Sequence, residues 1–159
     1  MPHASIVQIS VSPGGVPKKP VEEAVVTALG LVGDGHHDTK HHGGPERAVC
    51  LFAIEVIERL AAEGHPITPG ATGENLTLRG VPWPDLVPGA RLAFAGGVEL
   101  EVTAYTTPCA TIRNAFLRLE HRRVSQDLHP GESRVYARVL REGRVVRGES
   151  VTVRSPASG

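Results

Sequence analysis

The stretch RLAFAGGVELEVTAY, residues 91–105, decides the fold class of this chain. Apolar residues recur on both sides of Gly96-Gly97, which predicts strands over residues 91–95 and 98–105 joined by a two-residue turn. A hairpin pairs its strands antiparallel, so we expect an antiparallel sheet around this stretch.

Further strands are predicted on both sides of the hairpin, because short β-branched runs end repeatedly at glycine or proline. Near the C-terminus, the strands expected near 135–141 and 144–147 come directly before and after Glu142-Gly143, which predicts a turn between them. The expected strands are residues 5–12, a segment within 21–35, residues 73–81, and strands near 135–141, 144–147 and 150–154.

Helices are expected to be few. Apolar residues recur at helical spacing over residues 46–63, Pro45 suits the first helical position, and Gly64 ends the pattern. A shorter helix is predicted over 111–119. Since strand–helix–strand spacing occurs only once, a doubly wound parallel sheet is excluded. We expect a single α+β domain: a mostly antiparallel, barrel-like sheet with a few packed helices.

Composition narrows the range of partners. Seventeen basic residues balance seventeen acidic ones, and aromatic residues make up 4% of the chain, so we expect binding neither to nucleic acid nor to a membrane surface. The first ten residues predict no signal peptide, and no apolar run is long enough to span a bilayer. With only two cysteines, Cys50 and Cys109, we expect reduced thiols and a cytoplasmic protein.

Cys109 is the candidate reactive residue. In TTPCATI, Thr107 can cap a helix and Pro108 fits its first position, which places Cys109 in the first turn. The unpaired N–H groups there favour the thiolate, which is both the nucleophile and a soft metal ligand. Cys50 lies inside the helix predicted over 46–63 and is expected to be a small core residue. Without a Cys-x-x-Cys motif, a resolving partner for dithiol chemistry is not expected.

The histidine-rich loop GDGHHDTKHHGGPERAV, residues 33–49, allows two interpretations. One is a zinc site formed by His36, His37, His41 and His42, but the glycines around them favour a loop, and zinc needs three or four ligands at defined spacing. Alternatively, Gly43-Gly44 before a helix start offers free N–H donors to an oxyanion, with His42 and Arg47 as further donors. An anion site is the better supported of the two.

Taken together, four stretches resemble the MOSC domain, the C-terminal domain of molybdenum cofactor sulfurase, which also occurs as small stand-alone bacterial proteins. They follow in the order GLVGDGHHDTKHHGGPERAV, GATGENLTLRGV, TTPCATI and RVYARVLREGRVVRGESV. The specific elements are Gly33-Asp34, His42-Gly43-Gly44, Gly73-Glu74-Asn75 and Cys109. The resemblance covers residues 5–154 and implies a β-barrel-rich α+β fold.

The resemblance also implies a function and a site. It implies binding of the molybdenum cofactor (molybdopterin), with Cys109 as the molybdenum ligand and catalytic residue, and reduction of N-hydroxylated compounds independently of pyridoxal phosphate. Asp34 is expected to organise the glycine loop through hydrogen bonds to backbone. The implied cofactor-binding residues are Lys40, His42, Gly43, Gly44, Arg47, Glu74, Asn75, Arg123, Ser125 and Arg134.

One departure and two alternatives accompany this interpretation. Relatives often carry an arginine two residues before the Pro-Cys pair, where this chain has Thr106. A non-catalytic sulfur or cofactor carrier using a Cys109 persulfide, or a zinc- or anion-binding module at His36–His42, would account for parts of the pattern. Besides a small-molecule substrate, a redox or sulfur-donor partner protein is expected, because no flavin, haem or iron–sulfur motif is present.

Overall fold

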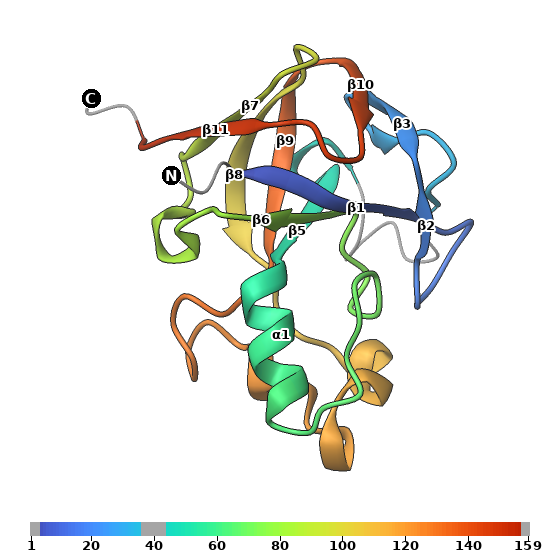
Figure 1. Ribbon diagram of the computed structural model, residues 1–159, viewed down its shortest axis with the longest axis vertical. Coiled ribbons are helices and arrows are strands. Elements are labelled where there is room, and N and C mark those ends of the chain that lie inside the picture. Colours follow the sequence, from blue (N-terminus) through green and yellow to red (C-terminus); the bar gives the residue numbers. More distant parts are fainter. Residues whose placement is uncertain (1–3, 36–43, 157–159) are drawn as a thin grey trace.

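The structure, a computed structural model, describes residues 4–35 and 44–156 (Figure 1). Two β-sheets form most of it. The larger has eight strands in the order β11 (Val151–Arg154), β7 (Arg91–Phe94), β8 (Glu99–Tyr105), β9 (Val135–Arg141), β5 (Val49–Ala53), β6 (Leu76–Arg79), β1 (Ser5–Val11) and β2 (Lys19–Val21). The smaller has the order β10 (Gly143–Val146), β3 (Glu23–Thr27) and β4 (Gly30–Leu31).

The strand pairing confirms a mixed α and β fold with a mostly antiparallel sheet. Among the described strands, only β5 and β6 run parallel, and the α-helix α1 (Ile54–Ala62) connects them. The expected barrel does not close among the described strands. Strand β1 meets the segment just before β11 through a single bridge between Ser5 and Ser150. Neighbouring backbone hydrogen bonds, such as that from the Ile6 N–H to the Glu149 carbonyl, add to this contact.

The hairpin that set the fold class is confirmed. β7 and β8 pair with Arg91 opposite Glu101 and Ala93 opposite Glu99. The last hydrogen bond before the turn runs from the Phe94 N–H to the Val98 carbonyl. It encloses a loop of three residues, 95–97, instead of the predicted two. Gly97 has φ +106°, a backbone conformation that glycine adopts without a steric penalty.

The helix predicted over 46–63 is wrong in its first half. Pro45–Arg47 form a 3-10 turn, η1, and Val49–Ala53 form strand β5 before α1 begins. All five residues of β5 are buried, because β6 and β9 flank the strand within the sheet. A short, continuously apolar run fits a buried strand as well as a helix, so periodicity could not separate the two.

Two other expectations at the C-terminal side are also corrected. β9 and β10 do not form a hairpin: β9 pairs with β8 and β5, whereas β10 pairs with β3. Only Glu142 separates the two strands, which is too short for a hairpin loop, so the chain crosses from one sheet to the other. The helix predicted over 111–119 is a series of 3-10 turns, η3 (Ala110–Ala115), η4 (Leu117–Leu119) and η5 (His121–Val124).

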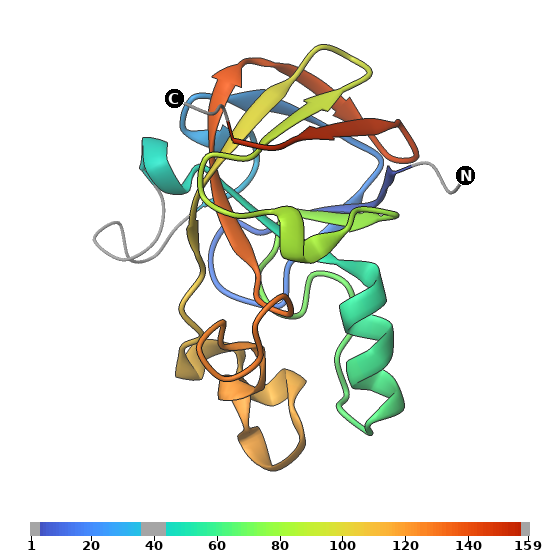
Figure 2. The same ribbon diagram turned by 90° about the vertical axis from the view of Figure 1, so that its left-hand side faces the viewer.

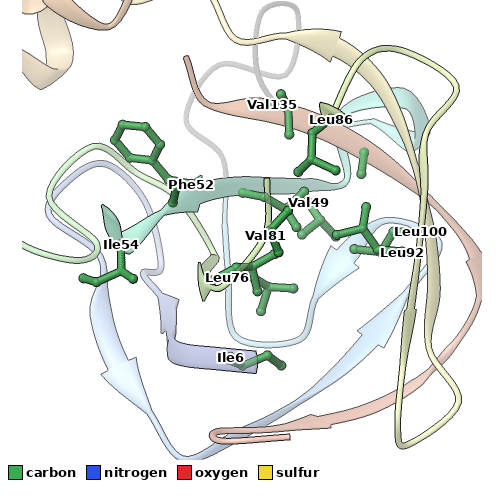
Figure 3. Packing of buried hydrophobic residues seen from close by; sticks show 14 of the residues in the cluster. Ile6, Val49, Phe52, Ile54, Leu76, Val81, Leu86, Leu92, Leu100 and Val135 are labelled. Atoms are coloured by element: carbon green, nitrogen blue, oxygen red, sulfur yellow. The ribbon is translucent and has the colours of Figure 1, made fainter. Parts of the chain in front are cut away.

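A single apolar core holds the sheets and α1 together (Figure 3). Phe52 packs edge-on against Trp83, in the turn η2 (Trp83–Asp85), with ring centroids 6.5 Å apart. Each fully buried leucine or isoleucine contributes about 1.5–3 kcal/mol. Leu51, Leu60, Leu76, Leu78, Leu92 and Leu100 are among the fully buried side chains.

Figures 1 and 2 show α1 and the turns of residues 110–124 at the same end of the molecule, beyond the sheets. The gold and orange segment containing these turns follows β8 and leads into β9, so Cys109 lies where the chain leaves the larger sheet. Among the described helices, none combines the length and hydropathy that crossing a membrane requires.

Candidate functional site

A pocket of about 230 Å³ brings together residues from most of the chain. Four residues predicted from the sequence line it: Arg47, Asn75, Cys109 and Arg134. They come from η1, the turn before β6, the segment after β8 and the start of β9. The pocket also has lining residues that the sequence analysis did not name as site residues, among them Lys18, Cys50, Thr72, Thr106 and Tyr136.

Cys109 is a free, half-buried cysteine in the wall of this pocket. The predicted cap is wrong: Cys109 itself, not Thr107, precedes the turn η3, with φ −126° and ψ 166°, and no side chain caps the turn. Because η3 is a six-residue 3-10 turn, it lacks the aligned dipoles of an α-helix that were expected to favour the thiolate. The position of the thiol in the pocket therefore carries the case for Cys109.

Arg134 brings a cation with unused hydrogen-bond donors to the same pocket. Its residue is 5% exposed, and its Nη1 donates to the Thr72 carbonyl at 2.7 Å. Its Nε and Nη2 are buried, and no described residue accepts a hydrogen bond from them. A buried guanidinium with two unsatisfied nitrogens is costly to the fold and suited to an oxyanion.

A second arginine and a tyrosine form another part of the wall. The Arg47 guanidinium lies 5.5 Å from the centre of the Tyr136 ring, a cation–π distance. Burial, with a smaller contribution from the charge of Cys50, raises the pKa of Tyr136 to about 12. The Tyr136 hydroxyl is therefore protonated at neutral pH, and the residue lines the pocket.

The predicted anion cradle can be followed only in part. Gly44, with φ +80°, precedes η1 but does not line the pocket, and η1 has only three residues. Lys40, His42 and Gly43 lie outside the described residues, as do the other histidines of the loop, His36, His37 and His41. Within residues 4–35 and 44–156, no group of three or more His, Cys, Asp or Glu side chains could hold a metal ion.

Asp34 and Asn75 form a buried scaffold beneath the pocket. One Asp34 oxygen accepts from the backbone N–H of Ser12 at 3.0 Å, and the other accepts from Lys18 Nζ at 2.6 Å and Asn75 Nδ2 at 2.9 Å. Asp34 was expected to bond to the backbone of the glycine loop; the backbone bond that it makes among the described residues goes instead to Ser12, after β1. Asn75 Oδ1 accepts from the backbone N–H of Cys50 at 3.0 Å, so the amide of Asn75 positions neighbouring chain segments.

Glu74 shapes the turn that faces Arg134. Its carboxyl group is fully buried, does not line the pocket, and accepts hydrogen bonds from the Gly70 N–H and from the hydroxyls of Thr72 and Thr77. These bonds fix the turn whose Thr72 carbonyl accepts from Arg134. Glu74 supports the site from behind, whereas the resemblance implied contact with the cofactor.

Arg123 and Ser125 are not brought to this pocket. The Arg123 guanidinium forms a bidentate pair with Glu63, at 3.1 and 3.0 Å, and a further bond to Glu132 at 3.1 Å. Those two carboxylates occupy the donors that a phosphate would need. The ion pairs connect the end of α1 to the turns at residues 121–132.

Cys50 was expected to be a core residue within a helix; it is buried as expected, but its location in a strand and in the pocket wall was missed. It is 6% exposed, lies in strand β5, and lines the pocket together with Cys109. Its Sγ lies 3.8 Å from Thr106 Oγ1. Burial raises the pKa of the Cys50 thiol, against an opposing effect of the Arg134 charge. The location of Cys50 could have been predicted only from the strand pairing, in which Cys50 lies directly opposite Tyr136.

Comparison with known proteins identifies the family. The profile of the MOSC domain matches residues 38–152, so the chain belongs to the MOSC domain family. It is 31% identical to the uncharacterized protein YflK of Bacillus subtilis over 145 residues, covering 89% of this chain and 63% of YflK. The chain thus spans less than two thirds of that relative's length.

Solved structures agree with this assignment. YiiM from Geobacillus stearothermophilus has a TM-score of 0.77 and 26% identity, covering 98% of this chain and 77% of that protein. YuaD from Bacillus subtilis has a TM-score of 0.79 at 20% identity and covers 98% of both chains, a likeness of fold. The resemblance inferred from the four stretches is therefore confirmed.

Proposed function

We propose that this protein binds the molybdenum cofactor in the pocket of Cys109 and Arg134, with Cys109 as the molybdenum ligand, and reduces N-hydroxylated compounds. The observation that carries the proposal is the buried guanidinium of Arg134, whose Nε and Nη2 have no acceptor among the described residues. The pocket that it lines also contains the half-buried thiol of Cys109.

The residues present fit such a group chemically. A pterin cofactor with a phosphate and a thiolate-bound metal requires donors for an oxyanion and a soft ligand in the same cavity. Arg134 supplies two unused donors, and Arg47 and the protonated Tyr136 hydroxyl lie in the same wall. Cys109 supplies the soft ligand. Family membership raises the weight of this assignment, because the domain takes its name from molybdenum cofactor sulfurase.

Arg134 also answers the departure at Thr106. Relatives often have an arginine at that position, and here Thr106 is 3% exposed and donates its backbone N–H to the Arg134 carbonyl at 2.9 Å. The two residues are therefore adjacent across β8 and β9. We infer that Arg134 supplies the positive charge in this part of the pocket that an arginine at 106 supplies in those relatives.

The residues in and around the pocket have separate parts in this proposal. When bound, the cofactor supplies the redox chemistry, a net transfer of two electrons and two protons that converts an N-hydroxylated compound into an amine and water. Arg134 and Arg47 bind anionic groups, Asn75 and Asp34 hold the surrounding segments, and Cys109 fixes the metal. The electrons come from a partner protein, the expected redox partner.

Native mass spectrometry tests this function. Wild-type protein purified anaerobically from a host that makes the molybdenum cofactor is compared with protein from a host that cannot make it. We expect one molybdopterin and one molybdenum per chain in the first sample only, and reduction of a hydroxylaminopurine with an artificial electron donor. Cofactor binding without reduction, together with a persulfide on Cys109, would favour the carrier alternative. Absence of bound cofactor would contradict the proposal.

A further inference from the structure

The only two cysteines of the chain lie in the wall of the same pocket. They are 59 positions apart in the sequence, so their common location is a product of the fold. We propose that Cys50 and Cys109 form a reversible disulfide when the protein without cofactor meets a hydroperoxide. Cys109 is the sulfur oxidised first, and Cys50 is the resolving thiol.

Cys50 is held in a fixed position facing the segment that carries Cys109. Strand pairing with Tyr136 and the hydrogen bond from its N–H to Asn75 hold the Cys50 backbone. Its sulfur lies 3.8 Å from the hydroxyl of Thr106, three residues before Cys109. Tyr136 lies in the wall of the same pocket as both cysteines.

The two thiols have different environments, which sets the order of reaction. Cys109 is half-buried and free, whereas Cys50 is buried. Burial raises the pKa of Cys50, which keeps its thiol protonated and protects it from direct oxidation. The nearby charges of Arg134 and Lys18 act in the opposite direction on the same pKa but do not overcome the effect of burial.

The chemistry balances with a hydroperoxide as the oxidant. The Cys109 thiolate attacks the peroxide oxygen, the O–O bond breaks, and Cys109 becomes a sulfenic acid while the peroxide leaves as hydroxide or alkoxide. The Cys50 thiol then attacks that sulfur. A disulfide bond forms, the S–O bond breaks, and the proton of Cys50 leaves with the hydroxyl group as water. An external thiol restores both cysteines by exchange.

The bond also places a geometric requirement on the site. A disulfide needs Cα atoms within about 7 Å. Cys50 is in a central strand, whereas residues 106–109 belong to no helix or strand. The backbone near Cys109 is therefore the part that moves to bring the two Cα atoms within this distance. Since a bound metal would occupy the Cys109 sulfur, the reaction belongs to protein without cofactor, and its outcome is independent of the function proposed above.

Peptide mapping of cofactor-free protein tests the proposal. Wild type, Cys50→Ser and Cys109→Ser are treated with hydrogen peroxide in the presence of dimedone, which traps sulfenic acids, and are digested with trypsin without reduction. In wild type we expect residues 48–59 to be linked to residues 92–113, the loss of both free thiols together, and their recovery with dithiothreitol. In Cys50→Ser we expect dimedone on Cys109 instead.

A second measurement needs no variant. Phenylarsine oxide bridges two neighbouring thiols, and we expect it to block both cysteines of wild type at one equivalent per chain. Linked peptides in monomeric protein and this stoichiometry would support the pair. Equal dimedone labelling of Cys109 in wild type and Cys50→Ser, with no linked peptide and no bridging by the arsenical, would overturn it.

Discussion

Replacing Arg134 by methionine should stabilise the protein without ligand while abolishing its response to anions. Each buried, unsatisfied polar group costs about 1–3 kcal/mol, and Arg134 has two such nitrogens. The substitution also removes the charged hydrogen bond to the Thr72 carbonyl, worth about 1.5–3 kcal/mol. With mid-range values of both terms, Arg134→Met is about 2 kcal/mol more stable, a rise in Tm of about 4–8 °C for a chain of this length.

Thermal unfolding with and without inorganic phosphate measures both effects. At a phosphate concentration of about a hundred times its dissociation constant, wild type should gain about 2.7 kcal/mol and Arg134→Met should gain nothing. Arg144→Met is the matched control, because Arg144 pairs with Glu23 on the smaller sheet at an exposed site. If Arg134→Met is less stable than wild type without ligand, or if phosphate stabilises both equally, the assignment of an anion site to Arg134 is refuted.

Three further predictions concern hydrogen bonds and an ion pair that stabilise the fold. Asn75→Ala should lower the free energy of unfolding by about 2–4 kcal/mol in urea, because buried partners of its amide lose their bonds; an unchanged midpoint would contradict this. His65 Nδ1 accepts from the Leu117 N–H at 3.0 Å, so ¹⁵N NMR should show the Nε2–H tautomer, and the opposite tautomer would refute this. His65→Ala should lower the free energy of unfolding by about 1–3 kcal/mol, whereas His65→Asn should keep it close to that of wild type. Hydrogen bonds from Arg123 lower the pKa of Glu63 below 4.5, so this pair stabilises the folded protein above pH 4.5, and the stabilisation is lost as the pH falls through the folded pKa. Arg123→Met should therefore weaken the dependence of the free energy of unfolding on pH in this acidic range, and identical dependence in wild type and variant would count against the prediction.

The strands were predictable where the pattern and the turn agreed. The hairpin over 91–105 was correct because alternation and paired glycines both point to it. The run Val49–Ala53 was assigned to a helix because a strand buried on both faces shows no alternation. The partner of β10 could not be predicted, because pairing with β3 depends on contacts more than 110 positions away in the sequence.

The site was predictable to the extent that its residues lie in recognisable motifs. Four residues named from the resemblance, Arg47, Asn75, Cys109 and Arg134, line the same pocket, and the cofactor-binding role implied for them stays a prediction. Arg123 was predicted as a phosphate contact because an arginine-rich turn carries no sign of its partners. Its two carboxylates come from other parts of the chain, and only the folded structure brings them together.

The residues that sequence reasoning missed belong to the interior. Cys50 and Tyr136 lie opposite each other on two neighbouring strands, a relation that depends on a register the sequence does not reveal. Lys18 reaches the site through its ion pair with Asp34. Such residues have no motif of their own, because their role comes from the tertiary contacts that close the pocket.

X-ray absorption at the molybdenum K-edge tests the central claim most directly. Wild type and Cys109→Ser are purified anaerobically from a host that makes the cofactor, and the sulfur ligands of the metal are counted in each. We predict that wild type shows one more molybdenum–sulfur contact than Cys109→Ser, while Cys50→Ser matches wild type. Equal sulfur counts in wild type and Cys109→Ser, or protein containing no molybdenum, would contradict the assignment.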